Sequence, residues 1–551
     1  MARVGTSTVV FCPLANLARE VVACLQGSHR GLDDFGFAKR LKFGHASVCP
    51  IEDAVVLLIL EFTDLGAAEA SQLAAEEVAR TLSSLGQPLG LRSEKPLPEL
   101  FAHWGWCSWD AHGVGVRAEH LEAMAAKHRP PWLVLDDGWQ EDVEPAEWRR
   151  WLHTPQSRSL ARPGFGSLQD LVRTLRSSGS ALLVWHTLLG YWGGVADGRG
   201  FAVGRRRPLW PSGLQAGCPS EVDVWDGDFC TLETEDDMEK FYADFYTALG
   251  DAGVAGVKCD GQFLPEVLIG ARRAAKLAEI QAAAAKALEG GAPLPQQRSR
   301  AHSNASNEKD GSKHGIDVTS LFVSGCVVLT RVSDDHAYPG VAEDARSVAR
   351  HIWHCASNSL WLAPFVHCDW DMLKTGEWHA AIHAVARAVA GCPAARRRVY
   401  ASDTADSFNG EVLAPLLLPD GTGRVVPCEA VLHVHCISVA VPIERHVFLD
   451  PLSQAELMWL WNRSRGGPFG FRYPSDVDEE LVSLLELCGS ELDAKEPDSW
   501  DVQLHFMGFA VVALAPILSF FGHRVAVFGL AGVWNPTGTL AELPRADSDG
   551  S

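Results

Sequence analysis

Carboxylates follow several apolar runs of this 551-residue sequence, at the points where those runs end. The clearest case is "PWLVLDDGWQ" (131–140), in which four apolar residues lead directly into Asp136 and Asp137. Asp260 stands in the same place in "AGVKCDG" (255–261). Carboxyl groups act as nucleophiles and as general acids or bases, and their oxygens accept hydrogen bonds from hydroxyl groups or ligate metal ions. These acids therefore predict catalysis, the binding of a hydroxyl-rich ligand, or metal ligation.

Further acids occupy corresponding positions after other apolar runs. The whole set comprises Asp110, Asp136, Asp137, Asp260, Asp334, Asp335, Asp369, Asp371 and Asp403. If the runs are parallel strands, their carboxyl ends meet at one face of the sheet, where barrel enzymes form their active sites. The alternative is that these acids cap helices by accepting bonds from free N–H groups. Capping is the stronger alternative for Asp110 and Asp403 taken singly.

Tryptophans accompany the acids in the same segments, namely Trp106, Trp109, Trp139, Trp185, Trp192 and Trp370. Helix caps need no neighbouring indole, so capping explains the whole set poorly. Carboxylates together with indole faces favour carbohydrate, because acids accept bonds from sugar hydroxyls and indoles stack on apolar faces. "HIWHC" (351–355) places His351 and His354 one helical turn apart, but no ordered ligand spacing accompanies them. We expect core or capping histidines, no metal and no cofactor.

Short β-like runs alternate with amphipathic helical patterns between residues 101 and 405. The runs are 103–110, 132–139, 181–192, 255–261, 327–335, 359–371 and 397–403, with an eighth candidate in "IDVTSLFVSGC" (316–326). The clearest helical patterns are 117–128, 167–179 and 235–253. Alternation of strand and helix predicts an α/β fold with a parallel sheet. Eight such units in this length favour a (β/α)8 TIM barrel over an open sheet.

Two regions flank the predicted barrel. Residues 1–100 combine a few strands with the helical pattern at 66–86 and form a short N-terminal region. Residues 406–551 carry an Asp-Gly turn between apolar runs and predict a small C-terminal β-domain. Within the barrel, 290–313 is rich in Pro, Ser, Asn and Gln and predicts a polar loop insert.

Composition excludes several classes of partner. The 48 basic and 69 acidic residues give a net charge of −21, which argues against binding of nucleic acid or anionic membranes. The sequence shows neither a secretory leader nor an apolar run of about 18 residues. The 14 cysteines include no CxxC pair, so a reducing compartment is the simpler expectation. We expect a cytoplasmic protein with no membrane partner.

The motifs "GWCSWDA", "LVLDDGWQ", "VWHTLLGYWGG", "GVKCDGQ", "RVSDD", "NSLWLAPF…DWDM" and "ARAVAGCP" occur here in one order. In that order and approximate spacing the sequence resembles the raffinose synthase and alkaline α-galactosidase family. Members of that family are also called seed imbibition proteins, and they are related to glycoside hydrolase family 36. The resemblance extends over about residues 70–540 and includes "LLLPDGT", "FLDP" and "LMWLWNRS". Each motif is weak alone, but seven in order are specific.

The resemblance implies roles for the catalytic residues. Asp260 in "VKCDG" matches the proposed nucleophile, and Lys258 beside it matches a ligand of sugar hydroxyls. "RVSDD" matches the segment that holds the general acid/base, with Arg331 orienting the substrate. Alignment on "SD" favours Asp334 as this acid, whereas counting from the arginine favours Asp335.

The resemblance also implies a sugar-binding set. Asp136 and Asp137 resemble the pair that grips the galactose hydroxyls, with Trp139 closing the pocket. Trp109, Trp185 and Asp369 complete the residues expected to bind substrate. The implied substrates are small sugars: galactinol, sucrose, raffinose or other α-galactosides.

The implied reaction is a double displacement that retains the anomeric configuration. It needs two carboxyl groups about 5–5.5 Å apart, which two different strand ends supply and two adjacent residues do not. A lysine on the nucleophile's strand face favours its charged form, and a neighbouring carboxylate helps the acid to keep its proton. Water would then release galactose, or an acceptor sugar would take it.

Two other functions compete with this one, and the sequence departs from the family in three places. The protein could be a non-catalytic or degenerate carbohydrate-binding member, or an unrelated metal-dependent barrel isomerase. The N-terminal region is short, the polar insert replaces a strand usually found before "RVSDD", and a long insertion typical of synthases is absent. These departures bear on the binding of the acceptor sugar.

Overall fold

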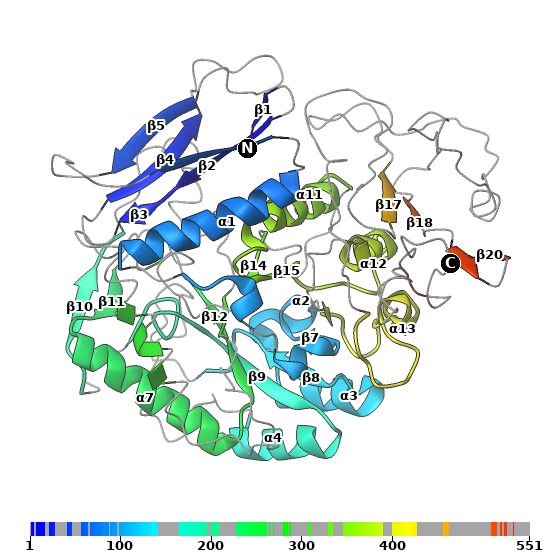
Figure 1. Ribbon diagram of the computed structural model, residues 1–551. Coiled ribbons are helices and arrows are strands. Elements are labelled where there is room, and N and C mark those ends of the chain that lie inside the picture. The colour runs from blue at the N-terminus through cyan, green and yellow to red at the C-terminus, as the bar shows by residue number, and fades with distance from the viewer. Residues whose placement is uncertain are drawn as a thin grey trace.

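The computed structural model describes an α/β protein built on one large parallel sheet with helices (Figure 1). This confirms the predicted α/β class. The structure describes residues 2–4, 7–16, 21–27, 41–46, 57–63, 67–86, 89–95, 98–140, 165–195, 200–208, 228–261, 264, 268, 279–280, 282–284, 286–287, 307–309, 329–333, 345–389, 399–426, 456–461, 509–514, 518–520, 523–525 and 533.

Eight strands form the parallel sheet, in the order β15-β14-β13-β12-β9-β8-β7-β16, so the strands from β7 to β15 lie in chain order. They are β7 (Gly105–Cys107), β8 (Trp132–Leu135), β9 (Ala181–Thr187), β12 (Gly256–Asp260), β13 (Asn307–Lys309), β14 (Leu329–Arg331), β15 (His367–Asp369) and β16 (Tyr400–Ala401). The last strand, β16, pairs with the first, β7, and the two run parallel. Beyond β15, a parallel bridge joins Leu373 to Ala401 of β16. There the Leu373 N–H donates to the carbonyl of Tyr400 at 2.8 Å.

Helices follow these strands along the chain and lie around the sheet (Figure 1). They are α2 (Trp109–His112), α3 (Ala118–His128), α4 (Leu168–Ser177), α7 (Glu235–Ala252), α11 (Ala345–Leu362), α12 (Ala380–Val389) and α13 (Gly410–Leu413). Ser167 and Thr234 cap α4 and α7, since each hydroxyl accepts a bond from a backbone N–H of the first turn. Leucines at 168, 171 and 175 recur at helical spacing and bury one face of α4.

The strands separate an outer core from an inner one. On β9, Leu182 and Val184 belong to the large hydrophobic core beneath α4 and α7. Leu183 belongs instead to a small inner cluster that also contains Val134 and Tyr400. Alternate residues of a strand face opposite sides, so this pattern defines which side chains face inward. On β12 the odd-numbered residues 257 and 259 join the outer core, which leaves Lys258 and Asp260 on the inner face.

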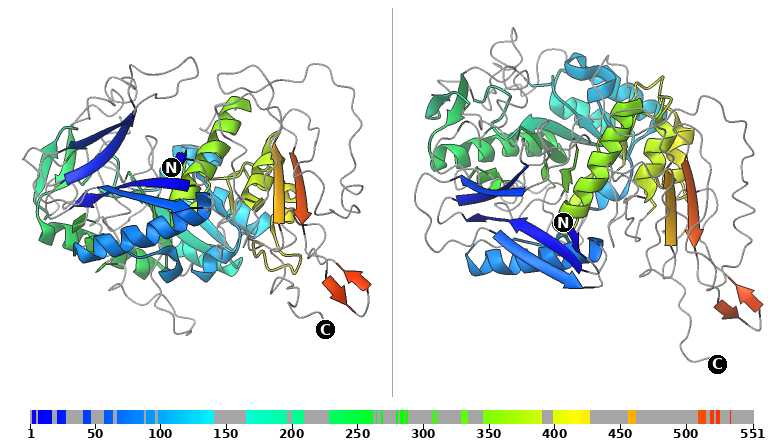
Figure 2. Two further views of the ribbon diagram at one scale, coloured as in Figure 1. Left: turned by 45° about the horizontal axis from the view of Figure 1, so that its top comes forward. Right: turned by 90° about the horizontal axis from the view of Figure 1, so that it is seen from above.

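Smaller sheets flank the parallel one (Figure 2). The N-terminal strands are β1 (Ala2–Val4), β2 (Ser7–Pro13), β3 (Ala15–Asn16), β4 (Val21–Gly27), β5 (Leu41–Ala46) and β6 (Leu57–Thr63), followed by α1 (Ala67–Ser84). Residues of β2 and α1 share a hydrophobic cluster with α11 and α12. The C-terminal pairs are β17 (Glu456–Trp461) with β18 (Phe509–Leu514), and β19 (Leu518–Phe520) with β20 (His523–Val525). An antiparallel hairpin, β10 (Val203–Arg206) and β11 (Phe229–Leu232), follows β9.

The predicted Asp-Gly turn at 420–421 lies between two segments joined by an antiparallel bridge from Leu417 to Val425. This hairpin packs on the start of the parallel sheet, because the N–H of Trp104 donates to the carbonyl of Gly423 at 3.0 Å. Trp104, Val425 and Leu416 share one hydrophobic cluster. The first part of the predicted C-terminal domain is thus attached to the strand that opens the sheet.

Two expectations about individual strands are wrong. Residues 307–309, inside the predicted polar insert, form β13 and pair with β12 and β14 through backbone bonds that any side chain permits. The apolar run at 359–371 is not one strand, because 359–362 ends helix α11 and only 367–369 form β15. In an apolar stretch that is buried on all sides, the periodicity of apolar residues does not distinguish a helix from a strand. The alternative strand at 316–326 lies outside the described residues.

Among the described residues, no helix is both long and apolar enough to span a membrane.

Glycine is required directly after the paired acids. Gly138 has a φ of 104°, and a Cβ there would lie 2.7 Å from the backbone of Val114. We expect Gly138→Ala to lower the free energy of unfolding by about 1–2 kcal/mol for the left-handed backbone and by a further ~1–3 kcal/mol for the clash. Gly179→Ala is the matched control, since Gly179 has a φ of 86° but no atom within 4 Å of its added Cβ. Equal losses for the two variants in urea titrations would contradict the steric account.

Candidate active site

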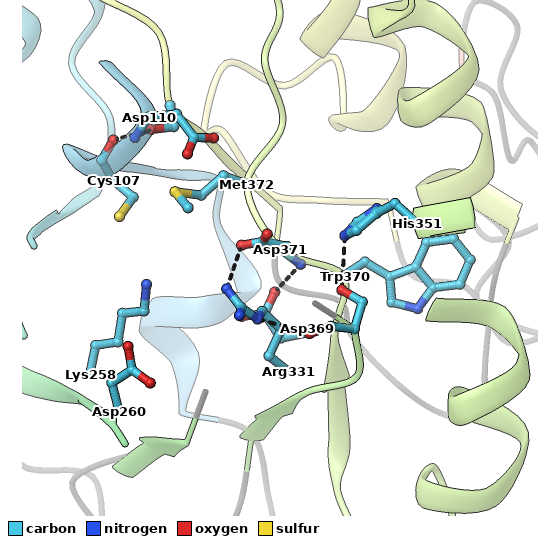
Figure 3. Close-up of polar contacts among 12 residues, drawn as sticks. Cys107, Asp110, Lys258, Asp260, Arg331, His351, Asp369, Trp370, Asp371 and Met372 are labelled. Atoms are coloured by element: carbon cyan, nitrogen blue, oxygen red, sulfur yellow. Dashed lines mark hydrogen bonds and ion pairs between the residues drawn. The ribbon is translucent and has the colours of Figure 1, made fainter. Parts of the chain in front are cut away.

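Charged side chains meet at the carboxyl ends of the parallel strands. Asp136 follows β8, Lys258 and Asp260 lie on β12, Arg331 ends β14 and Asp369 ends β15. Figure 3 shows Lys258 and Asp260 on one strand, with Arg331 and Asp369 to the right of them. The structure therefore brings together, from strands far apart in sequence, five of the residues that the sequence singled out.

Asp136 is held by an ion pair. The Nζ of Lys258 donates to Asp136 Oδ2 at 2.9 Å, and both side chains are only 4% exposed. The Cys107 thiol lies 3.1 Å from the same oxygen, and the Asp136 N–H donates to Ser108 Oγ at 2.9 Å. The Asp137 N–H donates to the other carboxylate oxygen at 2.8 Å. Both oxygens of Asp136 are thus engaged within the protein.

Asp137 is held by aromatic residues after β9. The Tyr191 hydroxyl donates to Asp137 Oδ1, and the Trp192 indole N–H donates to Oδ2 at 2.9 Å. Burial raises the pKa of Asp137 to about 7, although the bonds from Tyr191 and Trp192 oppose this rise. The "GYW" of the sequence motif therefore supplies two contacts that the residue types alone did not reveal.

Asp260 ends β12 and turns directly into a glycine. The N–H of Gly261, whose φ is 64°, donates to Asp260 Oδ1 at 2.6 Å. The Trp185 indole N–H donates to Asp260 Oδ2 at 3.2 Å from the neighbouring strand. Donors to a carboxylate favour its ionised form, as attack on a carbon centre requires.

Arg331 lies between two acids of the β15 end. Its Nη1 is 3.3 Å from Asp371 Oδ1, and its Nε donates to the Ser333 carbonyl at 3.2 Å (Figure 3). Asp369 accepts bonds from the Tyr400 hydroxyl at 3.1 Å and from the Asp371 N–H at 3.0 Å. Burial, and then the charge of Asp371, raise the pKa of Asp369 to about 6, while Arg331 and Lys258 oppose the rise.

The three selected tryptophans occupy different environments. Trp139 is fully buried in the outer core and donates its indole N–H to the Trp185 carbonyl at 2.8 Å, so it packs behind the acids. Trp185 is 1% exposed and acts as a hydrogen-bond donor to Asp260. Trp109 is partly buried at the start of α2 and packs on the inner cluster. The expectation that Trp139 closes the sugar site is therefore not met in this arrangement.

Helix capping does not account for the central acids. The oxygens of Asp136 and Asp137 accept bonds from the side chains just described and from the N–H groups of Asp137 and Gly138, none of which begins a helix. Asp403 behaves as a cap of a loop, because it accepts bonds from the N–H groups of Thr375 and Gly376 at 2.8 and 3.0 Å. These N–H groups belong to a loop ahead of α12 and begin no helix, so Asp403 is not a helix cap either.

Asp334 and Asp335 lie outside the described residues, as does the side chain of His354. His351 accepts or donates one bond to Ser333 Oγ at 2.8 Å, in a buried position on α11. Within the described part of the chain, no group of three or more His, Cys, Asp or Glu side chains could hold a metal ion. Cys107, Tyr191 and Tyr400 join the site beyond the residues selected from sequence, and Asp371, one of the strand-end acids noted there, contacts Arg331.

The raised pKa of Asp137 predicts a dependence of stability on pH. Between its ordinary value of 3.8 and about 7, the unfolded carboxyl is ionised whereas the folded one keeps its proton. Folding then binds a proton, so the free energy of unfolding should fall as the pH rises through this window, by on the order of a few kcal/mol.

Asp137→Asn should flatten that fall, because an amide does not titrate, and urea unfolding from pH 4 to 8 measures it. Asp369→Asn is the matched control and should flatten the curve only below about pH 6, its own raised pKa. The assignment would be contradicted if the free energy of unfolding changed with pH by the same amount in the wild type and in the Asp137→Asn variant.

Comparison with known proteins places the chain in a family. A family model described as "Raffinose synthase or seed imbibition protein Sip1" matches residues 73–150 and 151–467. The chain is 31% identical over 364 residues to probable galactinol–sucrose galactosyltransferase 6 of Arabidopsis thaliana, covering 60% of this chain and 44% of that one. It is 30% identical over 408 residues to a galactinol–sucrose galactosyltransferase of Oryza sativa subsp. japonica, covering 68% and 48%.

The chain therefore spans about half the length of these curated relatives. Among solved structures, an α-galactosidase from Thermus thermophilus in complex with stachyose is similar with a TM-score of 0.42 and 15% identity, covering 74% of this chain and 76% of that one. Because the family model matches well over half of the sequence, the protein belongs to the raffinose synthase and seed imbibition protein family.

Proposed function

We propose that the protein is an α-galactosyl-transferring or α-galactoside-hydrolysing enzyme of raffinose-family oligosaccharide metabolism. It would act by double displacement through a covalent galactosyl-enzyme. The observation that carries the proposal is the arrangement on β12, where Asp260 and Lys258 share the inner face and Lys258 reaches Asp136 at 2.9 Å. A retaining glycosidase requires a nucleophilic carboxylate and a second carboxyl as general acid/base, and here Asp260 would be the nucleophile, with Lys258 and Asp136 beside it in position to bind sugar hydroxyls.

The scaffold for this chemistry would be a closed (β/α)8 barrel. Support comes from the pairing of β16 with β7 and from the bridge between Leu373 and Ala401 beyond β15. Eight parallel strands in chain order whose last member returns to the first form a ring. Closure would make the inner face the barrel interior and the strand ends a single active-site face.

In the first step, the ionised Asp260 carboxylate would attack the anomeric carbon as the glycosidic bond breaks. The bonds from Trp185 and Gly261 would hold that carboxylate in place for the attack. A general acid on the "RVSDD" segment, Asp334 or Asp335, would give its proton to the departing oxygen. In the second step the same residue would deprotonate water or an acceptor hydroxyl, which displaces Asp260 and restores the enzyme.

The galactose hydroxyls would be held by the acids around Lys258. An ionised carboxylate offers about four acceptor positions. Counting bonds from the described residues, Asp136 accepts three, and Asp137 also accepts three, from Tyr191, Trp192 and the Gly138 N–H, so each keeps some acceptor capacity for hydroxyls. Asp136 would chiefly fix the Lys258 ammonium, and Arg331 would orient the substrate from the opposite side.

The donor would be galactinol, raffinose or another α-galactoside, and sucrose would be the acceptor in transfer. The named relatives are galactinol–sucrose galactosyltransferases, which supports this choice of sugars. A cytoplasmic location is part of the proposal, as is the absence of metal and cofactor. The competing function is a carbohydrate-binding protein without turnover, which the same acids would serve.

Asp260→Asn should abolish turnover and leave galactose binding largely unchanged, because only the charged oxygen attacks whereas the amide keeps the size of the group. We expect the kcat on p-nitrophenyl α-galactoside to fall by at least about a thousandfold, and calorimetry to give a galactose Kd within a few-fold of wild type. Asp403→Asn is the control, since it changes a strand-end acid that caps a loop. More than about a tenth of the wild-type rate in Asp260→Asn would exclude the nucleophile assignment.

The acid/base residue should show a leaving-group signature. Alanine at the true acid, Asp334 or Asp335, should slow hydrolysis of raffinose far more than that of an activated aryl galactoside, because a good leaving group needs little protonation. Azide should restore the rate of that variant by acting as a small anionic nucleophile in the second step. If neither variant behaves in this way, the acid lies elsewhere, and Asp369 and Asp371 are the next candidates.

A further inference from the structure

The segment 370–372, directly after β15 and named the 370–372 turn for its left-handed residue, has an unusual backbone conformation. Asp371 has a φ of 67°, and only Arg129 shares a positive φ among the described residues that are not glycine. Such a conformation is unfavourable for a side-chain-bearing residue and persists where its surroundings hold it. Arg129 ends helix α3, where a left-handed residue is an ordinary cap. Asp371 ends no helix, so another contact must hold it.

That contact comes from α12. Arg387 is 2% exposed and lies behind the turn. Its Nη2 lies within hydrogen-bond distance of three consecutive carbonyl oxygens, those of Trp370 at 2.7 Å, Asp371 at 3.1 Å and Met372 at 3.0 Å. Its Nη1 reaches the His383 carbonyl one turn earlier on the same helix at 3.2 Å. One guanidinium thus ties the whole turn to α12.

The turn determines where the Asp371 side chain points. Its carboxylate meets Nη1 of Arg331 at 3.3 Å, and its N–H donates to Asp369 at 3.0 Å (Figure 3). Arg331 is 2% exposed, so its guanidinium cannot turn freely toward solvent. The orientation of Arg331 therefore depends on Asp371, and that of Asp371 depends on Arg387.

We propose that Arg387 is a positioning residue of the galactosyl site, which acts through the 370–372 turn and Asp371 on Arg331. The proposal rests on the proposed function, in which Arg331 orients the sugar. Arginine is required here because its planar fork presents several N–H donors in fixed directions, whereas a lysine ammonium is a compact point charge. Arg387→Lys should therefore fail to restore the site although the charge is kept.

A double-mutant cycle tests the proposal, with kcat/KM on p-nitrophenyl α-galactoside as the readout. Arg387→Met and Arg331→Met should each lower kcat/KM by about 10–100-fold, the range for loss of a hydrogen bond from a charged group. If Arg387 acts through Arg331 as proposed, the double variant should match Arg331→Met within about twofold. Arg387→Lys should resemble Arg387→Met. Effects that multiply in the double variant would overturn the proposal.

Loss of stability alone must be separated from loss of positioning. Leu175→Ala truncates a fully buried side chain of α4, away from the turn, and should lower Tm while keeping kcat/KM within about twofold of wild type. If Arg387→Met does not fold, the cycle is run with Asp371→Asn, because asparagine tolerates the left-handed backbone and removes only the charge. Its effect should likewise vanish in the Arg331→Met background, and an independent effect would count against the proposal.

Failure of the proposed function has a different signature. Wild-type protein that neither turns over α-galactosides nor binds galactose in calorimetry would refute that function, and the role of Arg387 toward a sugar with it. An active wild type with a multiplicative cycle would refute the role of Arg387 alone.

Discussion

The ion pair between Lys258 and Asp136 is the interaction on which the rest of the site depends. Both side chains are 4% exposed, and the atoms are 2.9 Å apart. Removal of one partner from a buried pair typically costs about 3–5 kcal/mol, because the other charge is left without compensation. The pair joins β8 to β12 across β9, the strand between them. It therefore fixes the two strand ends from which Asp137 and Asp260 extend.

Because of strand geometry, this pair belongs to a layer of charged side chains that lies above a layer of apolar ones. Residues two apart share a face, so Lys258 and Asp260 point inward together, while the small cluster of Val134, Leu183 and Tyr400 fills the inner face below. Burial then sets the protonation of the acids, raising the pKa of Asp137 to about 7. Charges with fixed partners in a poorly hydrated site need little rearrangement during a reaction, which is the basis of electrostatic preorganisation.

Much of this arrangement follows from local sequence. Acids after apolar runs, with glycine behind them, identified β8 and β12 and the side chains at their ends, because alternation and left-handed turns are local properties. Tyr191 and Arg387 were not predicted from the sequence, because their roles arise from contacts between distant segments. β13 was not predicted either. It forms through backbone pairing with β12 and β14, although its polar side chains indicated a loop. Trp139 shows the opposite error: a local association with acids was taken for contact with ligand, whereas its indole is buried in the core.

The central claim is that Asp260 forms a covalent bond to galactose. The most direct test is the intact mass of the protein after incubation with a galactose-configured activated fluoride, followed by peptide mapping. The anomeric fluoride leaves as the bond to Asp260 forms, so we expect a mass increase of one glycosyl residue per chain, located on Asp260, and no increase in the Asp260→Asn variant. An active enzyme that gains no mass, or that carries the sugar on another residue, would contradict it.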